Sequence, residues 1–349
     1  MIKVKFYIVI LSLTALLVGC KPKANGGDNP DPHSSKTQLD HLVIWEVFYS
    51  GNWRSRTVNG KEYGYHDPKP MYIKIFNPTE EPKYLDGLCI AVSRHTNNTL
   101  TQTKFDKPED NFFKTHFAAN EILQIPGSGK EHIIKAGATI VIAKMAIDFT
   151  KPNPTSEEEG NPLSIDLSKA TFEWLTSDQI KKEDCEDNPN VPNLNRSFFI
   201  DEDFKFDPTN RTLVLFEVKD NEYFTKLGTK EPTYFKHYSI TERHHHGALY
   251  DSNTEAPVVP NEWIIDAVNI SPLNDYKMRN IVEKIDAGWF GVSQKTLIDA
   301  KKKKEDTGKA IRRKWNGKSY EDTNNSSLDF EVVKASLDKA QHNPSANAK

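Results

Sequence analysis

"HLVIWEVFYSG", residues 41–51, decides the fold class. Apolar and polar residues alternate along this stretch and turn-forming residues end it, which is the pattern of a half-buried β-strand. "PMYIKIFNPT", residues 70–79, has the same pattern. Short β-branched runs bounded by Gly, Pro, Asn or Asp follow at residues 86–93, 138–147, 211–218 and 262–270. Their shortness and spacing predict a mainly β protein with a β-sandwich fold.

Long polar stretches separate the predicted strands. We expect loop insertions near residues 94–132 and 152–208, because both stretches are too long for hairpin loops. Helix is a minor component, and its best candidates are residues 168–182 and 293–306. Residues 40–349 are therefore expected to form a single β-sandwich domain with long insertions and a few short helices.

The first twenty residues have the pattern of a bacterial export signal. Lys3 and Lys5 precede an apolar run that ends in Leu17-Val18-Gly19-Cys20. This run is shorter than the roughly 20 apolar residues of a membrane-spanning helix. Small residues before a cysteine resemble the lipobox of bacterial lipoproteins, which implies that residues 1–19 are removed as a signal peptide and that Cys20 is acylated. An ordinary signal with a chance cysteine is the alternative.

Residues 20–39 are rich in Pro, Gly, Asn and Ser and lack apolar periodicity, which indicates a flexible tether. Acyl chains on Cys20 would hold the domain at a membrane without a transmembrane helix. We expect a lipid-anchored protein of the outer membrane, at the cell surface. Lys21 and Lys23 precede the acidic residues of the tether, so the acidic pattern that favours surface display is weak. The periplasmic face of the membrane stays open as the alternative.

Net charge limits the classes of partner, and the cysteine content limits the disulfides that can form. The formal net charge of −3 becomes −5 when Lys3 and Lys5 leave with the signal peptide. This near balance implies neither a nucleic-acid partner nor an anionic lipid surface. Cys89 lies in an apolar run and is expected to be buried, whereas Cys185 lies in an acidic stretch. We expect two free thiols, and a disulfide between them stays open.

Several of these motifs resemble the lamin-tail domain, an immunoglobulin-like β-sandwich. Its opening strands, of the forms IxEV and YIEIYN, are similar to residues 44–47 and 72–77, and its next turn is similar to Leu85-Asp86-Gly87. Residues 135–143 look like its middle strand and residues 310–330 like its closing segment. Lys74 stands where lamin-tail proteins usually have an acidic residue, so no role of that carboxylate carries over.

The chain also resembles a family of secreted bacterial lipoproteins of unknown function that carry a lamin-tail-like domain. "YLDGLCI", residues 84–90, is one of the most specific features. The other is "RRKW", residues 312–315, followed by "DTNNSSLDF", residues 322–330. The resemblance extends from about residue 40 to about residue 336 and implies an immunoglobulin-like sandwich.

The "DTNNSSLDF" stretch also has a metal-binding interpretation. Asp322, Asn324 and Ser326 fall at alternate positions, as oxygen ligands do at the start of a calcium loop. An EF-hand loop needs glycine at its sixth position and glutamate at its twelfth, and these positions hold Ser327 and Val333. We therefore predict a polar turn that precedes the last strand.

The histidine cluster at residues 244–246 is the remaining metal candidate. On an extended segment His244 and His246 point to one face, where they could share a zinc or copper ion if His237 or Glu242 supplied another ligand. A solvated or hydrogen-bonded histidine cluster is the alternative. No other cofactor is expected, and this possible metal ion stays a hypothesis.

Aromatic residues in the connections indicate a binding surface. Trp53, Tyr63, Tyr65 and His66 lie in the first long connection, and Trp289 with Phe290 lies between Gly288 and Gly291. Exposed aromatic side chains at one end of a sandwich would suit a sugar, a peptide or a protein. Packing of these rings under the loops is the alternative.

The sequence contains no catalytic signature of the H-E-x-x-H, G-x-S-x-G or P-loop type. We therefore favour a lipid-anchored binding or scaffold protein of the cell envelope over an enzyme. By analogy with surface lipoproteins, it could assist a TonB-dependent outer-membrane transporter in nutrient capture. A surface hydrolase with its site in the insertions and a metal-handling lipoprotein that uses the histidine cluster are the alternatives.

Overall fold

The computed structural model describes residues 39–98, 101–103, 112–152, 160–174, 186–200, 206–243, 248–277, 279–294 and 304–342. These residues belong to one compact unit, Lys36–Lys349. Cys20, the predicted signal peptide and all but the last residue of the predicted tether lie outside the described residues. Within the described ranges, no helix has both the length and the apolar character needed to cross a membrane.

The first of two main sheets has six strands in the order β11-β10-β4-β1-β17-β18. Neighbouring strands are antiparallel except β10 and β11, which are parallel. The strands are β1 (Val43–Phe48), β4 (Tyr72–Phe76), β10 (Thr139–Ala143), β11 (Phe172–Glu173), β17 (Lys309–Arg313) and β18 (Phe330–Lys334).

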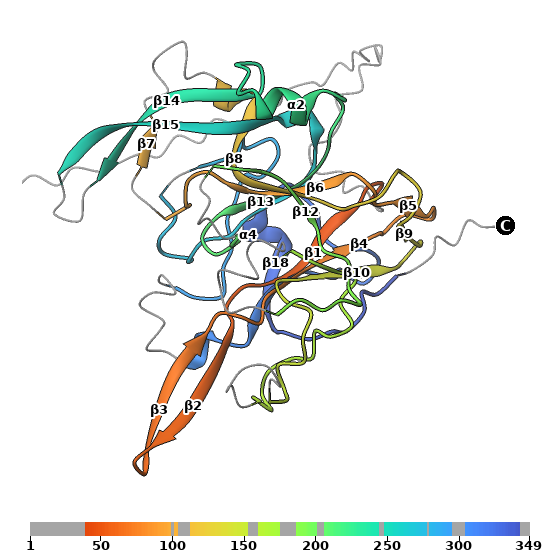
Figure 1. Ribbon diagram of the computed structural model, residues 1–349, viewed down its shortest axis with the longest axis vertical. Coiled ribbons are helices and arrows are strands. Elements are labelled where there is room, and N and C mark those ends of the chain that lie inside the picture. The colour runs from red at the N-terminus through yellow and green to blue at the C-terminus, as the bar shows by residue number, and fades with distance from the viewer. Residues whose placement is uncertain are drawn as a thin grey trace, which may run out of the picture. The chain divides into compact units, whose positions relative to one another are not determined.

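The second sheet has eight strands, seven of them in the order β16-β13-β6-β8-β15-β14-β7, with β12 paired to β8. All of these pairs are antiparallel. Figure 1 shows this sheet above the six-stranded one. Its strands are β6 (Leu88–Ser93), β7 (Thr101–Thr103), β8 (His116–Gln124), β12 (Asn195–Phe199), β13 (Thr212–Glu217), β14 (Phe235–Arg243), β15 (Leu249–Pro260) and β16 (Ile264–Asn269).

Short elements complete the described part of the chain. Two small antiparallel pairs are formed by β2 (Asn52–Val58) with β3 (Lys61–Asp67) and by β5 (Lys83–Tyr84) with β9 (Ile133–Ile134). The helical elements include the α-helices α2 (Tyr223–Gly228) and α4 (Ser326–Asp329) and the 3-10 turns η2 (Asn261–Trp263) and η3 (Lys304–Asp306).

The mainly β class and the sandwich architecture are confirmed. Each of the six predicted strands corresponds to an observed one: β1, β4, β6, β10, β13 and β16.

Two expectations are wrong in part. The expected insertions 94–132 and 152–208 contain β8 and β12, which pair with each other in the eight-stranded sheet. The expected helix 168–182 holds the short strand β11 instead, and residues 175–182 lie outside the described residues.

The sandwich core lies between the two sheets. Ile44, Ile73 and Ile75 from the first sheet meet Leu213 and Leu215 from the second in one buried cluster. Every residue of β1 and β4 is buried, so their outer face is covered too. Fully burying one such side chain stabilises the fold by roughly 1.5–3 kcal/mol, so this double coverage is a large part of the driving force.

A β-bulge in β1 turns the buried Glu46 side chain away from the apolar core between the sheets. The register of β1 against β4 shifts between Ile44 and Glu46. Glu46 contacts the Tyr72 hydroxyl and the Arg312 guanidinium, and its Oε1 lies 3.3 Å from Lys74 Nζ. Lys74 in turn donates to the Asp338 carbonyl at 3.1 Å, so the segment after β18 covers this network. Burial lowers the pKa of Lys74, while Glu46 opposes the shift.

Candidate functional site

Four of the predicted binding residues lie on one hairpin. Trp53 is in β2, and Tyr63, Tyr65 and His66 are in β3. The hairpin projects away from both sheets (Figure 1). Its turn is Asn59-Gly60, with φ of 51° and 76°, the conformation that a type I′ turn requires.

The base of the hairpin is rigidly attached to the sandwich. Arg54 forms a buried ion pair with Asp67, and a ring nitrogen of His66 lies 2.6 Å from the Ser50 carbonyl oxygen. The Trp53 ring covers Gly64, where a Cβ would lie only 2.3 Å from a ring carbon. Trp53 and His66 therefore serve in packing the hairpin, and Gly64 makes room for the indole.

The pairing register divides the hairpin into two faces. Arg56 lies opposite Tyr63, and Val58 lies opposite Lys61. Opposed residues of an antiparallel pair share a face, and so do residues two apart, so Tyr65 joins this set. We call Arg56, Val58, Lys61, Tyr63 and Tyr65 the aromatic-cationic face. Tyr63 and Tyr65 are 47% and 42% exposed, and Lys61 Nζ lies 5.4 Å from the Tyr63 ring centroid.

The other two predicted aromatic residues are packed into the fold. Trp289 stacks on Tyr276 with ring centroids 4.4 Å apart and nearly parallel planes. Its Nε1 donates to the Leu273 carbonyl at 3.3 Å. Phe290 is half-buried against the sandwich core and forms a bridge with Ile270. Neither ring extends the aromatic-cationic face, so core packing describes them better.

The predicted metal site is described only at one residue. His237 Nδ1 lies 3.3 Å from Glu255 Oε2, directly across the β14–β15 pair. It stands six residues before the end of β14, about 20 Å along an extended strand. His244 and His246 lie outside the described residues, and so does the side chain of Glu242.

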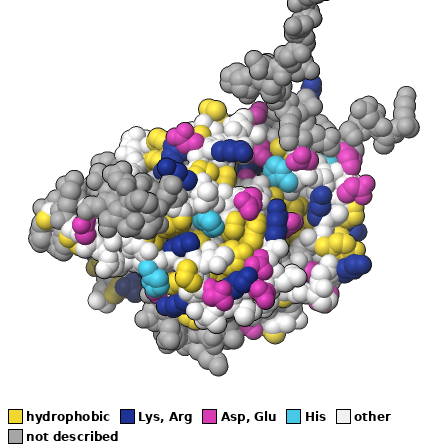
Figure 2. Space-filling model, turned by 90° about the horizontal axis from the view of Figure 1, so that it is seen from above, with side chains coloured by type: hydrophobic (Ala, Val, Ile, Leu, Met, Phe, Trp, Pro, Cys, Tyr) yellow, Lys and Arg dark blue, Asp and Glu magenta, His cyan; other side chains and the backbone are white. Residues whose placement is uncertain are grey.

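The surface over the eight-stranded sheet carries mixed charge. Figure 2 shows the face that bears β14, β15 and α2, with basic, acidic and hydrophobic side chains interspersed. Neither sign of charge dominates there. A candidate site must therefore be sought in local arrangements of side chains.

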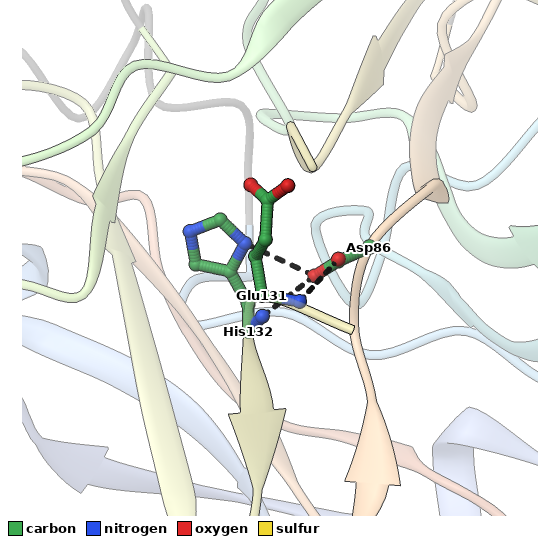
Figure 3. Close-up of side chains that lie close together, drawn as sticks. All are labelled: Asp86, Glu131 and His132. Atoms are coloured by element: carbon green, nitrogen blue, oxygen red, sulfur yellow. Dashed lines mark hydrogen bonds and ion pairs between the residues drawn. The ribbon is translucent and has the colours of Figure 1, made fainter. Parts of the chain in front are cut away.

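One such arrangement surrounds Asp86, in the turn that joins β5 to β6 (Figure 3). The carboxylate accepts hydrogen bonds from the backbone amides of Gly129, Glu131 and His132 at 2.6–2.8 Å, and His132 Nδ1 lies 3.0 Å away. Burial alone would raise the pKa of Asp86, but these donors lower it to about 2. Its side chain is fully buried.

Asp86, Glu131 and His132 also offer ligand atoms within 4.8 Å of one another. The carboxylate of Glu131 is already hydrogen-bonded to the Ser128 amide and hydroxyl. A metal ion would have to compete with these donors for the carboxylate oxygens. The arrangement is therefore a turn in which Asp86 holds the loop after β8 against the start of β6.

A pocket of about 420 Å³ opens beside this turn. Its walls come from four segments: the end of β5 with the Asp86 turn, the end of β8, the end of β13, and the residues that lead into α2. We call it the Tyr84 pocket. Its lining residues are Tyr84, Asp86, Gly87, Leu88, Gln124, Glu217, Val218, Asp220, Asn221 and Phe224.

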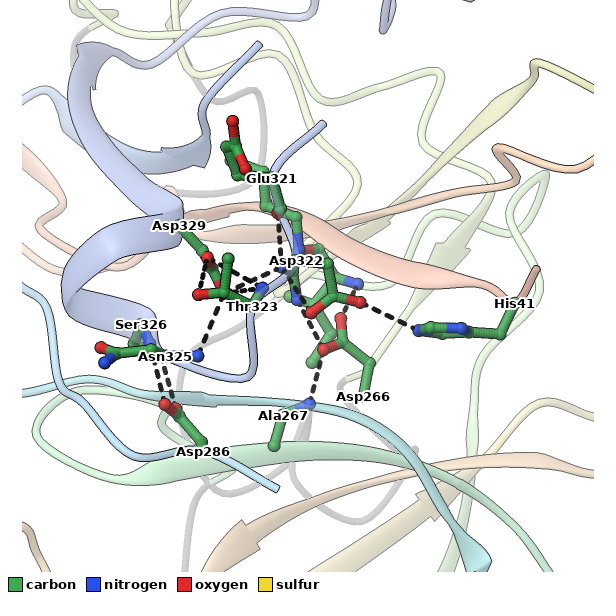
Figure 4. Close-up of polar contacts among 12 residues, drawn as sticks. His41, Asp266, Ala267, Asp286, Glu321, Asp322, Thr323, Asn325, Ser326 and Asp329 are labelled. Carbon is green, nitrogen blue, oxygen red and sulfur yellow. Dashed lines mark hydrogen bonds and ion pairs between the residues drawn. The ribbon is translucent and has the colours of Figure 1, made fainter. Parts of the chain in front are cut away.

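The predicted polar turn before the last strand is confirmed, and Figure 4 shows its acidic residues Asp322 and Asp329. Both bind a buried arginine, Arg313. Arg313 Nη2 lies 2.5 Å from Asp266 Oδ1, and its Nη1 lies 3.2 Å from Asp322 Oδ1 and 3.7 Å from Asp329 Oδ2. Asn325 caps α4 by accepting from the Ser327 amide. These carboxylates are committed to protein donors.

Of the two cysteines that follow the tether, the structure describes only Cys89. Cys89 is buried, as expected for its apolar strand. Burial raises the pKa of its thiol well above the usual range. Cys185 lies outside the described residues.

Residues 135–336, more than half of the chain, match a family described as "Protein of unknown function (DUF4876)". The chain belongs to the DUF4876 family. A crystal structure of a DUF4876 protein from Bacteroides thetaiotaomicron has a similar fold, with a TM-score of 0.61 at 20% sequence identity. The match covers 88% of this chain and 75% of that one. No curated protein is significantly similar in sequence.

Removal of the buried arginine should strongly destabilise this DUF4876 chain. Arg313→Ala leaves the buried Asp266 and Asp329 without their cation and Asp322 with His41 alone, so we expect the free energy of unfolding to fall by about 3–5 kcal/mol. Urea denaturation measures the change. Lys318→Ala, at an exposed position of the same segment, is the control and should change stability by less than about 0.5 kcal/mol. Equal stability of the two variants would contradict the role of Arg313.

His41 should make stability depend on pH. Burial lowers its pKa, but hydrogen bonds to Asp322 and Asp40 raise it to about 9. A raised histidine pKa stabilises the folded state fully below about pH 6.5, and this stabilisation is lost as the pH rises through 9. Because His41 is one-third exposed, we expect a loss on the order of 1 kcal/mol. Denaturation at pH 6, 7.5 and 9.5 should show this loss in the wild type and a flatter profile in His41→Gln.

Proposed function

We propose that this protein is a lipid-anchored binding or scaffold module of the cell envelope, with a lamin-tail-like sandwich as its rigid body. Acylated Cys20 holds it at the outer membrane, on the cell surface, and residues 20–39 form the tether. The observation that carries the binding role is the aromatic-cationic face on the projecting hairpin.

The composition of this face suits contact with a protein. Tyrosine and arginine contribute most often to the binding energy of interfaces, because they combine large area with hydrogen bonding. Tyr63, Tyr65 and Arg56 are all exposed and therefore available for such a contact.

Rigid attachment of the hairpin supports the same role. The Arg54–Asp67 ion pair and the Trp53 ring on Gly64 fix its base before any partner binds. A preorganised contact surface loses less conformational entropy on association. An outer-membrane transporter of the TonB-dependent class is the partner we propose, with nutrient capture as the shared task.

Lipid attachment can be tested at one atom. Cells that express the full chain and are fed an alkyne-labelled fatty acid should label the wild type and the Cys185→Ala control, while Cys20→Ala should lose the label. The wild type should also partition with membranes. Mass spectrometry that finds an unmodified Cys20 thiol on a released product would contradict the proposal.

The hairpin can be tested with variants of its two faces. Tyr63→Ala/Tyr65→Ala should weaken co-purification of a membrane partner from outer membranes by about tenfold or more, since hot-spot aromatics each contribute over about 1 kcal/mol. Thr57→Ala/Glu62→Gln changes the opposite face of the same hairpin and should leave the interaction unchanged. Equal loss in both pairs would mean that the hairpin face is not the contact surface.

A further inference from the structure

The Tyr84 pocket has walls that are fixed before any ligand arrives. Asp86 ties the loop of residues 129–132 to the start of β6 through three backbone amides. On the other side, Asp220 accepts from the Glu222 amide, the Tyr234 hydroxyl and Lys226 Nζ at 2.8–2.9 Å. These contacts position the segment that leads into α2.

Some polar groups of the lining keep their hydrogen-bonding capacity. The side chains of Glu217 and Asn221 and the Tyr84 hydroxyl have no hydrogen-bond partner among the described residues. Gln124 donates its Nε2 to the Gly87 carbonyl at 3.2 Å, which leaves its oxygen as an acceptor. Together they offer mostly acceptors and a few donors.

Apolar surface accompanies these groups. The Tyr84 side chain is 53% exposed, and the half-buried Phe224 supplies a second ring. The volume of about 420 Å³ falls within the roughly 300–1,000 Å³ of small-molecule sites. An aromatic ring beside directed polar groups suits a ligand with a C–H face and a hydroxyl edge.

The charges of the lining narrow the ligand class. No lysine or arginine lines the pocket, so a phosphate or carboxylate group would meet three carboxylates and no cationic side chain. Backbone amides stabilise the negative charge of Asp86 through hydrogen bonds, and Lys226 neutralises that of Asp220 in an ion pair. Glu217 alone gives a cation little advantage at an exposed position. A neutral ligand rich in hydroxyl groups remains.

We propose that the Tyr84 pocket binds a neutral saccharide, with Glu217 and Asn221 bound to its hydroxyl groups and Tyr84 packed against a sugar ring. This assignment names the ligand class of the proposed binding module and rests on that proposed function. The hairpin and the pocket share no residue, so the two surfaces can be tested separately.

The test is a binding assay on the purified full chain with maltose, cellobiose, N-acetylglucosamine and a printed array of neutral and anionic glycans. We expect binding of at least one neutral sugar or glycan and none of glucuronic acid. Tyr84→Ala and Glu217→Gln should each weaken binding about tenfold or more, whereas Tyr84→Phe, which keeps the ring, should retain most of it. Monosaccharide and array results distinguish a free sugar from a glycan chain.

Two controls make the result decisive. Glu331→Gln removes an exposed glutamate outside the pocket, and Tyr63→Ala/Tyr65→Ala alters the hairpin, so both should bind sugar as the wild type does. Failure to bind any neutral sugar or glycan, preference for anionic glycans, or binding that survives Tyr84→Ala would overturn the assignment. If the purified chain binds sugar but the fatty-acid labelling and the co-purification tests both fail, the lipid anchor and the membrane partner are overturned and the ligand class stands.

Discussion

Arg313 is the ionic link on which the sandwich depends. It lies on β17 in the six-stranded sheet, yet its strongest partner is Asp266 on β16 in the eight-stranded sheet. Asp266 also accepts from the Ile44 amide, and Arg313 donates to the Ile44 carbonyl. Two sheets that meet through hydrophobic side chains alone could slide past each other, whereas a buried ion pair has one geometry. The same guanidinium fixes the closing segment through Asp322 and Asp329.

The sequence predicted the strands whose environment is simple. β6, β10 and β13 are short, mainly apolar runs between turn formers, and β1, β4 and β16 were predicted although each holds one buried charged residue: Glu46, Lys74 and Asp266. β8 was not predicted, because two consecutive buried polar residues, Asn120 and Glu121, interrupt its apolar pattern. Arg94 Nη1 lies 2.6 Å from the Asn120 oxygen and Arg196 Nε lies 2.9 Å from Glu121. Partners this distant in sequence leave no trace in local hydrophobic periodicity.

The β2–β3 hairpin could have been predicted from its turn residues, although the aromatic residues alone do not indicate it. Asn59-Gly60 is the strongest short-range indication of a two-residue hairpin turn, and strand-forming residues flank it. With that turn in place, the register would have put Tyr63 and Tyr65 on one face and Trp53 on the other. The aromatic residues were therefore predictable as a set, but their division into packing and exposed members depends on pairing.

The Tyr84 pocket shows why a site can be invisible in sequence. Its walls join Tyr84 and Asp86 with Gln124 and with residues 217–224, which meet only because β6 lies between β8 and β13. Strand order in an antiparallel sheet is set by long-range pairing, so no local motif reports it. Gly127 and Gly129, both at positive φ, allow the loop after β8 to reach Asp86. The turn motif at residues 85–87 thus acts as a structural clamp, and the binding capacity lies in its neighbours.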